Sequence, residues 1–421
     1  MLIQTESPYS QSLGEGLVLR TATDERDVER VAEFCGSIHG PLVAGLSRHL
    51  ALYHPDQHGG DVVFVEDEAN GQVVSSLCLI PWTLDYEGVE LTAGEQGIVA
   101  TAEAYRRRGL IRAQVEYFKR RLSERGCLLS HIQGIPYFYR QFGYEYALPL
   151  EGGLLLEKRS VPEPPAQFTF RLATQDDLPI IKQFYDEAAH ELAIHTVRSE
   201  AIWRYLLTRA EGTEMACENW LVQAPDASVA GYMRLPMHHF GKELVVNEVS
   251  DLGFEAALAA LHHVKTCAEV RNQPAIRLNL PATSSMMRLA RSLGAHDLGT
   301  YAWQIHVPNM AALLWALGPV LQRRIAHSPF AALTREIPLC FYRETISLRF
   351  EAGRLAEVTN LGPTGTGPVN LPPLQFIPLL LGYRTLDDLR AVYPDVRVES
   401  AWRLLVDTLF PKVSSFLYTI Y

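Results

Sequence analysis

The 421-residue sequence predicts a mixed α/β protein, with α+β character, in which two similar units are followed by a third of different pattern. Three observations lead to this prediction. Strand and helix patterns alternate from Leu17 to Tyr146, and the proline-rich stretch at 159–167 is followed by a fainter copy of them. From Trp303 onward the pattern changes. The predicted domains are therefore 1–158, 168–302 and 303–421.

The first unit is predicted to start with the strand LVLR and an amphipathic helix from Asp27. Two strands, VVFVE and QVVSSLCLI, then flank Asn70-Gly71, a dipeptide typical of a hairpin turn. The strand GIVAT leads to a helix predicted from Leu110 to Arg125. Its apolar residues share one face, at Ile111, Val115, Phe118 and Leu122.

The second unit repeats parts of the first in weaker form. FRLATQDDLPIIKQF parallels LVLRTATDERDVERVAEF, and RLARSLGAH parallels YRQFGYEY. Its strand-to-helix turn, NEVSDLGFEAALAALHHV, has no arginine cluster, so we expect no anion site there. The third unit is predicted to contain a helix (MAALLWALGPVLQRRI), strands (ISLRFEAGRLAEVT), and two helices that begin near Leu374 and Ser400.

Composition and charge exclude several function classes. With 48% hydrophobic and 20% charged residues the chain should fold throughout. A net charge of −10 argues against binding to nucleic acid, which needs a basic face. Six cysteines without a close pair indicate a reducing cytoplasm, and no apolar run is long enough for a membrane span. We expect a cytoplasmic protein with neither nucleic acid nor membrane as partner.

The segment GIVATAEAYRRRGLIRAQVEYF carries the strongest functional signal. Its arginines stand at a helix N-terminus, where the helix dipole already places about half a positive charge. An anion should offset them. Unpaired N–H groups of the first helical turn, a glycine and flanking guanidinium groups together suit a pyrophosphate. The alternative is a solvated basic turn.

This segment resembles the signature of the GNAT acetyltransferases. Arg106-x-x-Gly109-x-Ile111 follows the pattern Arg/Gln-x-x-Gly-x-Gly/Ala, with Ile111 in place of the usual small residue. The stretch Tyr139-Arg140-Gln141-Phe142-Gly143-Tyr144 resembles that of the enhanced-intracellular-survival-type subgroup. The resemblance covers the whole chain. It implies two tandem GNAT-like domains, with mixed, mainly antiparallel central sheets flanked by helices, and a sterol-carrier-protein-like C-terminal domain that contains LLLGYRTLDDL and LFPKVSSFLYTIY.

The same resemblance implies acetyl-coenzyme A as the cosubstrate. Backbone groups of one strand would pair with the pantetheine arm, the arginine turn would hold the pyrophosphate, and the end of the next strand would line the thioester gap. The implied cofactor-binding residues are Val99, Ala100, Thr101, Arg107, Arg108, Gly109, Leu110, Ile111, Arg112, Gly134 and Ile135.

Two tyrosines are the implied catalytic residues. An amine that attacks the thioester must lose a proton, and the departing thiolate must gain one. The resemblance makes Tyr139 the acid, since a phenol with a pKa of about 10 is protonated at neutral pH. It makes the C-terminal carboxylate, here that of Tyr421, the base, provided that it is desolvated or relayed through water. The alternatives are core packing beside Phe138 and Phe142, and an idle docked strand.

Histidines offer two further candidates. His190-Glu191 and His195 form HExxxH, a spacing that does not place both histidines on one helix face, so no metal site is predicted. His131 is an alternative base or a hydrogen-bonded core histidine.

The predicted activity is therefore direct acetyl transfer to a primary amine, without metal or covalent intermediate. Members of the resembling subgroup acetylate aminoglycosides and other polyamines and form hexamers. By analogy this implies a homo-oligomer whose partner is a small aminoglycoside-, polyamine- or lysine-like amine. We expect its pocket between the first and C-terminal domains. Asp85, Glu90 and Glu95 could supply negative charge or form a solvated strand face.

A non-catalytic carrier is the alternative from another class. In that case the sterol-carrier-like domain would hold an apolar ligand and the GNAT-like domains would be a scaffold. An open apolar tunnel in the third domain would favour the carrier. A filled core, with the chain end inserted beside Tyr139, would favour catalysis.

Overall fold

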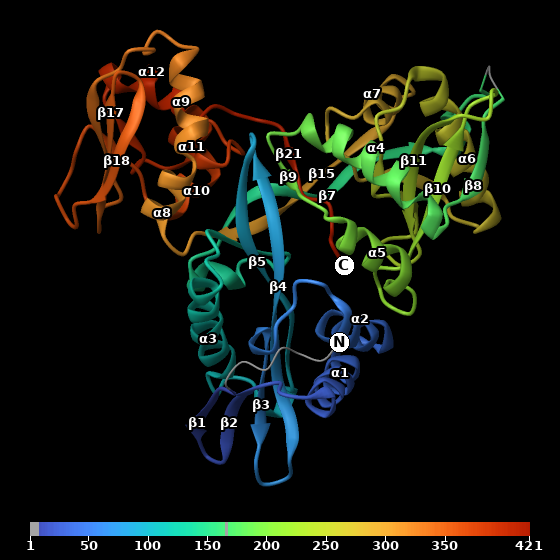
Figure 1. The fold of residues 1–421 in the computed structure, drawn as a ribbon, viewed down its shortest axis with the longest axis horizontal. Coiled ribbons are helices and arrows are strands. Elements are labelled where there is room, and N and C mark those ends of the chain that lie inside the picture. Colours follow the sequence, from blue (N-terminus) through green and yellow to red (C-terminus); the bar gives the residue numbers. More distant parts are fainter. Residues whose placement is uncertain (1–7, 165–166) are drawn as a thin grey trace.

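A computed structural model describes residues 8–164 and 167–421. The chain forms three lobes (Figure 1). The first is drawn in blue to teal, the second in green to yellow, and the third in orange. The long strands β4 (Gln72–Tyr86) and β5 (Val89–Thr101) run up from the first lobe to the place where all three lobes meet.

The main sheet joins the first two lobes. Among the described residues it has 12 strands, and its path is β1-β2-β3-β4-β5-β6-β15-β7-β14-β12, with β9 and β21 attached beside β4. Its other strands are β1 (Ser10–Gly14), β2 (Leu17–Thr21), β3 (Val62–Asp67), β6 (Leu129–Ile132), β7 (Glu145–Glu157), β9 (Ile194–Thr196), β12 (Leu244–Val246), β14 (Ala275–Leu278), β15 (His296–His306) and β21 (Ser415–Phe416).

Two smaller sheets belong to the second and third lobes. The second-lobe sheet, ordered β13-β11-β10-β8, contains β8 (Thr169–Leu172), β10 (Cys217–Gln223), β11 (Val229–Pro236) and β13 (Glu248–Val249). The third-lobe sheet, ordered β18-β17-β16-β19-β20, contains β16 (Arg335–Cys340), β17 (Thr345–Glu351), β18 (Arg354–Asn360), β19 (Val369–Asn370) and β20 (Arg397–Val398).

Helices cover these sheets in each lobe. The first lobe has α1 (Glu25–His39), α2 (Pro41–Tyr53) and α3 (Leu110–Glu124). The second has α4 (Leu178–His190), α5 (Glu200–Arg209), α6 (Phe254–Val270) and α7 (Ser285–Ser292). The third has α8 (Met310–Ala316), α9 (Gly318–Ala326), α10 (Pro373–Leu380), α11 (Leu386–Val392) and α12 (Ser400–Leu409). The mixed α/β fold class is confirmed.

Local sequence signals account for several elements. The Asn70-Gly71 dipeptide joins β3 to β4, which pair antiparallel as predicted. The helix predicted from Leu110 is α3. The single helix predicted over MAALLWALGPVLQRRI is wrong, because it consists of α8 and α9. Pro319 lies in the first turn of α9, where its missing N–H costs no hydrogen bond, and it cannot continue α8.

A strand from the end of the second lobe lies within the sheet of the first lobe. Strand β15 lies between β6 and β7 and pairs antiparallel with both, for example through Gln304 with Ile132 and Ala302 with Pro149. A late strand therefore completes the sheet of the first lobe. Strand β15 runs across the position between 302 and 303, and the division into three domains remains a prediction.

The third lobe has a packed aromatic core and sends its last residues away from itself. The ring centroid of Phe376 lies 5.0 Å from that of Phe341 and 5.2 Å from that of Phe410. The segment 411–421 then leaves the lobe, and β21 pairs in parallel with β9. Figure 1 shows this segment in red, ending at the junction of the lobes. Within the described ranges, no helix is long and apolar enough to cross a membrane.

Candidate active site

The central feature of the site is a split between two parallel strands. Strands β5 and β6 pair through Ala93 with Leu129, Gly94 with Ser130, and Glu95 with His131. The pairing stops there, although β5 continues to Thr101. Because the strands part beyond Glu95, one edge of β5 becomes available to a ligand that adds as a further strand.

A β-bulge lies in β5 at this point. The register with β4 shifts between Ser76 and Cys78, and Ile98 has a φ of 47°, a left-handed conformation that is uncommon for a branched side chain. Strained backbone of this kind clusters at functional sites. The predicted residues Val99, Ala100 and Thr101 follow directly, so they form the β5 edge beyond the bulge.

A turn with free N–H groups follows β5. Arg107 and Gly109 have φ values of 65° and 79°. The first N–H bonded by the helix backbone is that of Ala113, which donates to Gly109 O over 3.1 Å. In the described part of the chain, the N–H groups of residues 107–112 donate no hydrogen bond. Successive free N–H groups at a helix start form a concave site for phosphate oxygens.

Side chains around the turn divide between core and solvent. Leu110 is buried and Ile111 is half-buried in the core under α3, so both offer only their N–H groups to the turn. This explains how isoleucine can replace the usual small residue. Arg108 is exposed, lies over the Tyr105 ring at 5.0 Å, and is 3.7 Å from Glu15 Oε2. Exposed pairs of this kind are weak, so the guanidinium is available to a ligand.

Tyr139 lies against the end of β6. It belongs to the 3-10 turn η3 (Phe138–Phe142), and only 5% of its surface is exposed. A Cβ atom at Gly134 would be 2.2 Å from two carbons of the Tyr139 ring, so this contact requires glycine. Burial raises the pKa of Tyr139 above its ordinary value, which keeps the phenol protonated. The predicted residue Ile135 is 65% exposed.

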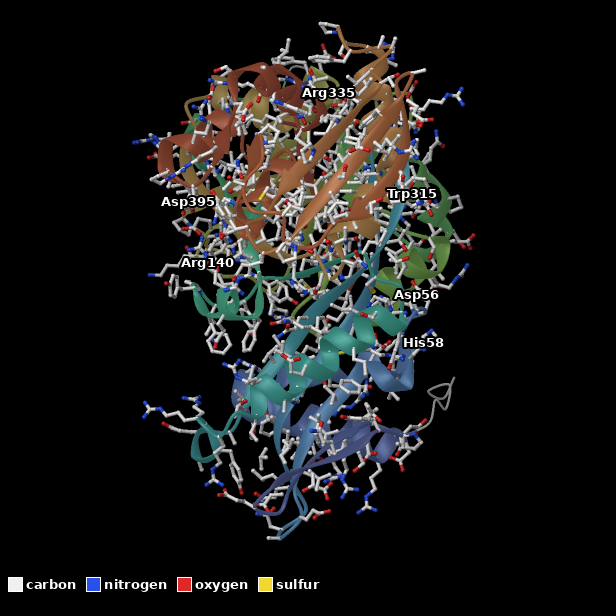
Figure 2. All side chains as sticks on the ribbon, turned by 90° about the vertical axis from the view of Figure 1, so that its left-hand side faces the viewer. Asp56, His58, Arg140, Trp315, Arg335 and Asp395 are labelled. Carbon is white, nitrogen blue, oxygen red and sulfur yellow. The ribbon has the colours of Figure 1, made fainter. Side chains whose placement is uncertain are left out.

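The third lobe braces this turn. Arg140 Nη2 donates to both carboxylate oxygens of Glu145, at 2.8 and 2.6 Å. Gln375 on α10 donates to the same carboxylate over 3.4 Å. Figure 2 labels Arg140, which lies at the margin of the orange third lobe. The turn that carries Tyr139 is therefore linked to the third lobe through Glu145.

Tyr421 reaches the split from the opposite face of the sheet. Its hydroxyl donates to Glu95 Oε1 over 2.7 Å, and its ring packs on Trp82 with centroids 6.2 Å apart. Side chains alternate along a strand, and the next residue, Gln96, accepts from Tyr144 on the face of Tyr139. Tyr139 and Tyr421 thus flank the split from its two sides.

Burial makes the groups beneath Tyr421 neutral. His131 Nε2 is 3.8 Å from Glu95 Oε2, and the imidazole lies between the rings of Trp82 and Trp303. Burial lowers the pKa of His131 to about 3 and raises the pKa of Glu95 to about 8. At neutral pH the histidine is unprotonated and a poor proton acceptor, and most of Glu95 carries its proton.

A cavity of about 420 Å³ adjoins the split at the junction of the lobes. The first-lobe wall is formed by the junction of α1 and α2, from His39 to Val43, and by Gln133, next to Gly134. The second lobe forms the opposite wall, and the tail 416–421 closes one side. We expect the substrate pocket between the first domain and the C-terminal one, where loops and the chain end meet. The chain end lines this cavity, and the body of the third lobe does not.

Sequence reasoning missed several residues of this cavity. Glu214 lies in the loop between α5 and β10, and His39 ends α1. His39 Nε2 is 3.2 Å from Val99 O, which ties the cavity wall to the bulged strand. Neither residue belongs to a motif, so no local signal could have identified it. Of the three carboxylates considered in the sequence, Glu95 reaches the site, Glu90 is exposed, and Asp85 accepts from Gly88 N.

Comparison with known proteins agrees with this geometry. A family model described as an acetyltransferase (GNAT) domain matches residues 44–147. This range contains β4, β5, α3, β6 and Tyr139. No curated protein sequence matches the chain.

Solved structures with the same fold span nearly the whole chain. A probable N-acyltransferase from Enterococcus faecalis V583 has a TM-score of 0.70 at 15% identity, with 98% of this chain and 100% of that one covered. A GCN5-related N-acetyltransferase from Anabaena variabilis ATCC 29413 has a TM-score of 0.68 at 16% identity, with 95% and 99% covered. Eis1 from Mycobacterium abscessus has 0.62 at 15% identity, with 96% and 100% covered. At such low identities, these TM-scores show a shared fold.

Proposed function

On the premise that residues 44–147 form a GNAT acetyltransferase domain, we propose that the protein transfers an acetyl group from acetyl-coenzyme A directly to a primary amine. One observation carries the proposal: the split between β5 and β6 adjoins both a turn with free N–H groups and exposed arginines and the cavity that the chain end lines. A long anionic cofactor and a separate acceptor can therefore meet at the split.

The cofactor would extend along β5. Its pyrophosphate would take the free N–H groups of residues 107–112, with Arg108 beside them. Its pantetheine amides would pair with backbone groups of Val99, Ala100 and Thr101. The thioester would then lie in the split, next to Gly134 and Tyr139.

The chemical step needs two proton transfers. The amine nitrogen attacks the thioester carbonyl carbon, the N–C bond forms, and the C–S bond breaks. We assign the proton for the departing sulfur to the phenol of Tyr139, whose raised pKa keeps it protonated. The amine proton would pass to the α-carboxylate of Tyr421, directly or through water. Their approach from opposite faces supports this division of roles.

The carrier alternative is less well supported. It needs an apolar ligand space in the third lobe, where Phe341, Phe376 and Phe410 are each at most 1% exposed and pack on one another. The tail leaves this lobe and ends at the split, which favours a role in acetyl transfer over storage of an apolar ligand. The likeness of the third lobe to sterol carriers remains part of the proposal.

Isothermal titration with acetyl-coenzyme A tests the proposal. We expect micromolar binding to the intact protein and its loss in Arg108→Ala/Gly109→Glu, because glutamate blocks the turn and repels phosphate. The variant Arg26→Ala/Gln72→Glu changes net charge equally at exposed positions of the same lobe and should bind normally. Thiol release with added amines then tests turnover. Absence of binding to the intact protein would refute the proposed function.

A further inference from the structure

The charges around the cavity point to the kind of amine that enters it. The residues lining the cavity include two glutamates, Glu214 and Glu248. A polyamine would require several carboxylates to replace the water around its ammonium groups. The state of these two glutamates therefore decides how many positive charges the cavity can accommodate.

Glu248 is already neutralised from within the protein. Its carboxylate accepts from Arg198 Nη1 at 2.8 Å, from Arg234 Nη1 at 3.4 Å and from the Tyr232 hydroxyl at 2.7 Å. The glutamate and both arginines are at most 2% exposed. One carboxylate faces two guanidinium groups, so this cluster has no negative charge left for a ligand.

Glu214 differs from Glu248 in its partners and in its burial. Within the described ranges its carboxylate has neither an ion pair nor a hydrogen bond, and its side chain is half-buried at the cavity wall. His39 and His238 face it from the first and second lobes. Burial raises its pKa, and the two histidines oppose this shift. It is the carboxylate among the described lining side chains that remains available for an ammonium group.

The rest of the wall disfavours a second positive charge. Arg277 lines the cavity and donates to Phe240 O over 2.7 Å, which holds a guanidinium near the rim. Trp303, Leu150 and Met215 supply apolar surface. Phe240, at the rim, is 75% exposed, an unusual state for an aromatic side chain that a bound apolar group would cover.

We infer that the acceptor is a primary amine with one positive charge on an apolar or aromatic body, and that Glu214 binds its ammonium group. The inference rests on the proposed function and narrows its substrate class. It excludes polycations such as aminoglycosides and spermidine as preferred acceptors. Near the split, the α-carboxylate of Tyr421 would take the proton that makes the bound amine nucleophilic.

Thiol release from acetyl-coenzyme A can compare matched acceptors. Phenethylamine and tryptamine represent aromatic monoamines, and spermidine and neomycin represent polycations. We expect kcat/KM at least about tenfold higher for the aromatic monoamines, since each unmatched charge costs more than the 1.4 kcal/mol that tenfold represents. A higher kcat/KM for either polycation would overturn the inference and leave acetyl transfer intact.

Variants locate the ammonium contact. Glu214→Gln should raise KM for phenethylamine about tenfold and change kcat much less, because a charge-assisted contact is lost in substrate and transition state alike. Glu211→Gln, an exposed neighbour in the same loop, is the control and should match the unmodified protein. Unchanged KM in Glu214→Gln would overturn the assignment. Turnover of neither amine class would refute the proposed function, and the inference with it.

Discussion

Two buried glutamates, one in each of the first two lobes, have opposite proton states. Glu248 in the second lobe lies between Arg198 and Arg234, and these cations lower its pKa despite the opposing effect of burial. Glu95 in the first lobe has a tyrosine hydroxyl and a neutral imidazole beside it, and burial raises its pKa to about 8. The presence of a cation, more than depth of burial, decides the charge.

The strand-to-helix turns before α3 and α6 also differ between the two lobes. Before α3, left-handed residues leave N–H groups free and arginines exposed. Before α6, Gly253 has a φ of −58°, Leu252 N donates to Ser285 Oγ, and Glu255 offsets the helix dipole. The N–H groups of residues 253–256 at the start of α6 also donate no hydrogen bond within the described ranges. The two helix starts therefore differ in charge, because arginines precede α3 and a glutamate stands in the first turn of α6. A helix start alone does not make an anion site.

Removing the charge of Glu248 should give the largest effect. Glu248→Leu leaves two buried guanidinium groups uncompensated and should lower the free energy of unfolding by about 3–5 kcal/mol. Arg108→Ala, which removes an exposed cation of the first region, should change it by at most about 0.5 kcal/mol. Urea midpoints followed by tryptophan fluorescence compare the two. Equal losses of unfolding free energy in the two variants would contradict the idea that Glu248 is part of a structural ion pair whereas Arg108 is available to a ligand.

Glu95 should make stability depend on pH. Its folded pKa of about 8 exceeds the ordinary 4.5, so between these values the folded protein holds a proton that the unfolded chain releases. The free energy of unfolding should therefore fall as pH rises, by on the order of 1 kcal/mol per pH unit between pH 5 and pH 8. Glu95→Gln should flatten this slope in thermal scans. A parallel slope in the variant would mean that Glu95 ionises normally.

Loss of the Tyr139 hydroxyl should separate chemistry from binding. Tyr139→Phe should lower kcat about 100-fold, the low end for general acid catalysis, with an unchanged Kd for acetyl-coenzyme A. Tyr205→Phe removes the hydroxyl of a buried tyrosine on α5 of the second lobe, where burial also raises the pKa, and should leave kcat unchanged. Full turnover in Tyr139→Phe would exclude this residue as the acid.

Extension of the tail should have the smallest effect of the four. A short polar extension after Tyr421 converts the carboxylate into an amide and crowds the cavity, so we expect kcat to fall about tenfold, roughly 1.4 kcal/mol. The same extension placed before Met1 is the control. Full activity of the tailed protein would exclude the terminal carboxylate as the base.

Local signals predicted what local physics determines. The Asn70-Gly71 turn, the start of α3 at Leu110 and the arginine turn all follow from neighbours in sequence, and each is where the pattern indicates. The assigned cofactor contacts and the roles of Tyr139 and Tyr421 remain predictions.

Contacts between distant segments could not be predicted. Nothing in the sequence near Glu214 indicates that it faces His39 across a cavity, because the two residues lie 175 positions apart in the chain. Glu95 was one of three candidate carboxylates, and only its pairing with Tyr421 distinguishes it from the exposed Glu90. Such pairings depend on how lobes pack, and composition or periodicity does not encode them.

The position of β15 has a consequence for how the protein is made and divided. During synthesis, β6 and β7 are complete long before β15 emerges to lie between them, so the nascent first lobe exposes two unpaired strand edges until about residue 306 has left the ribosome. An excised fragment 1–158 would keep those edges and should aggregate. We therefore expect that the first lobe cannot be detached, and that gene fusions or truncations must keep the second lobe with it.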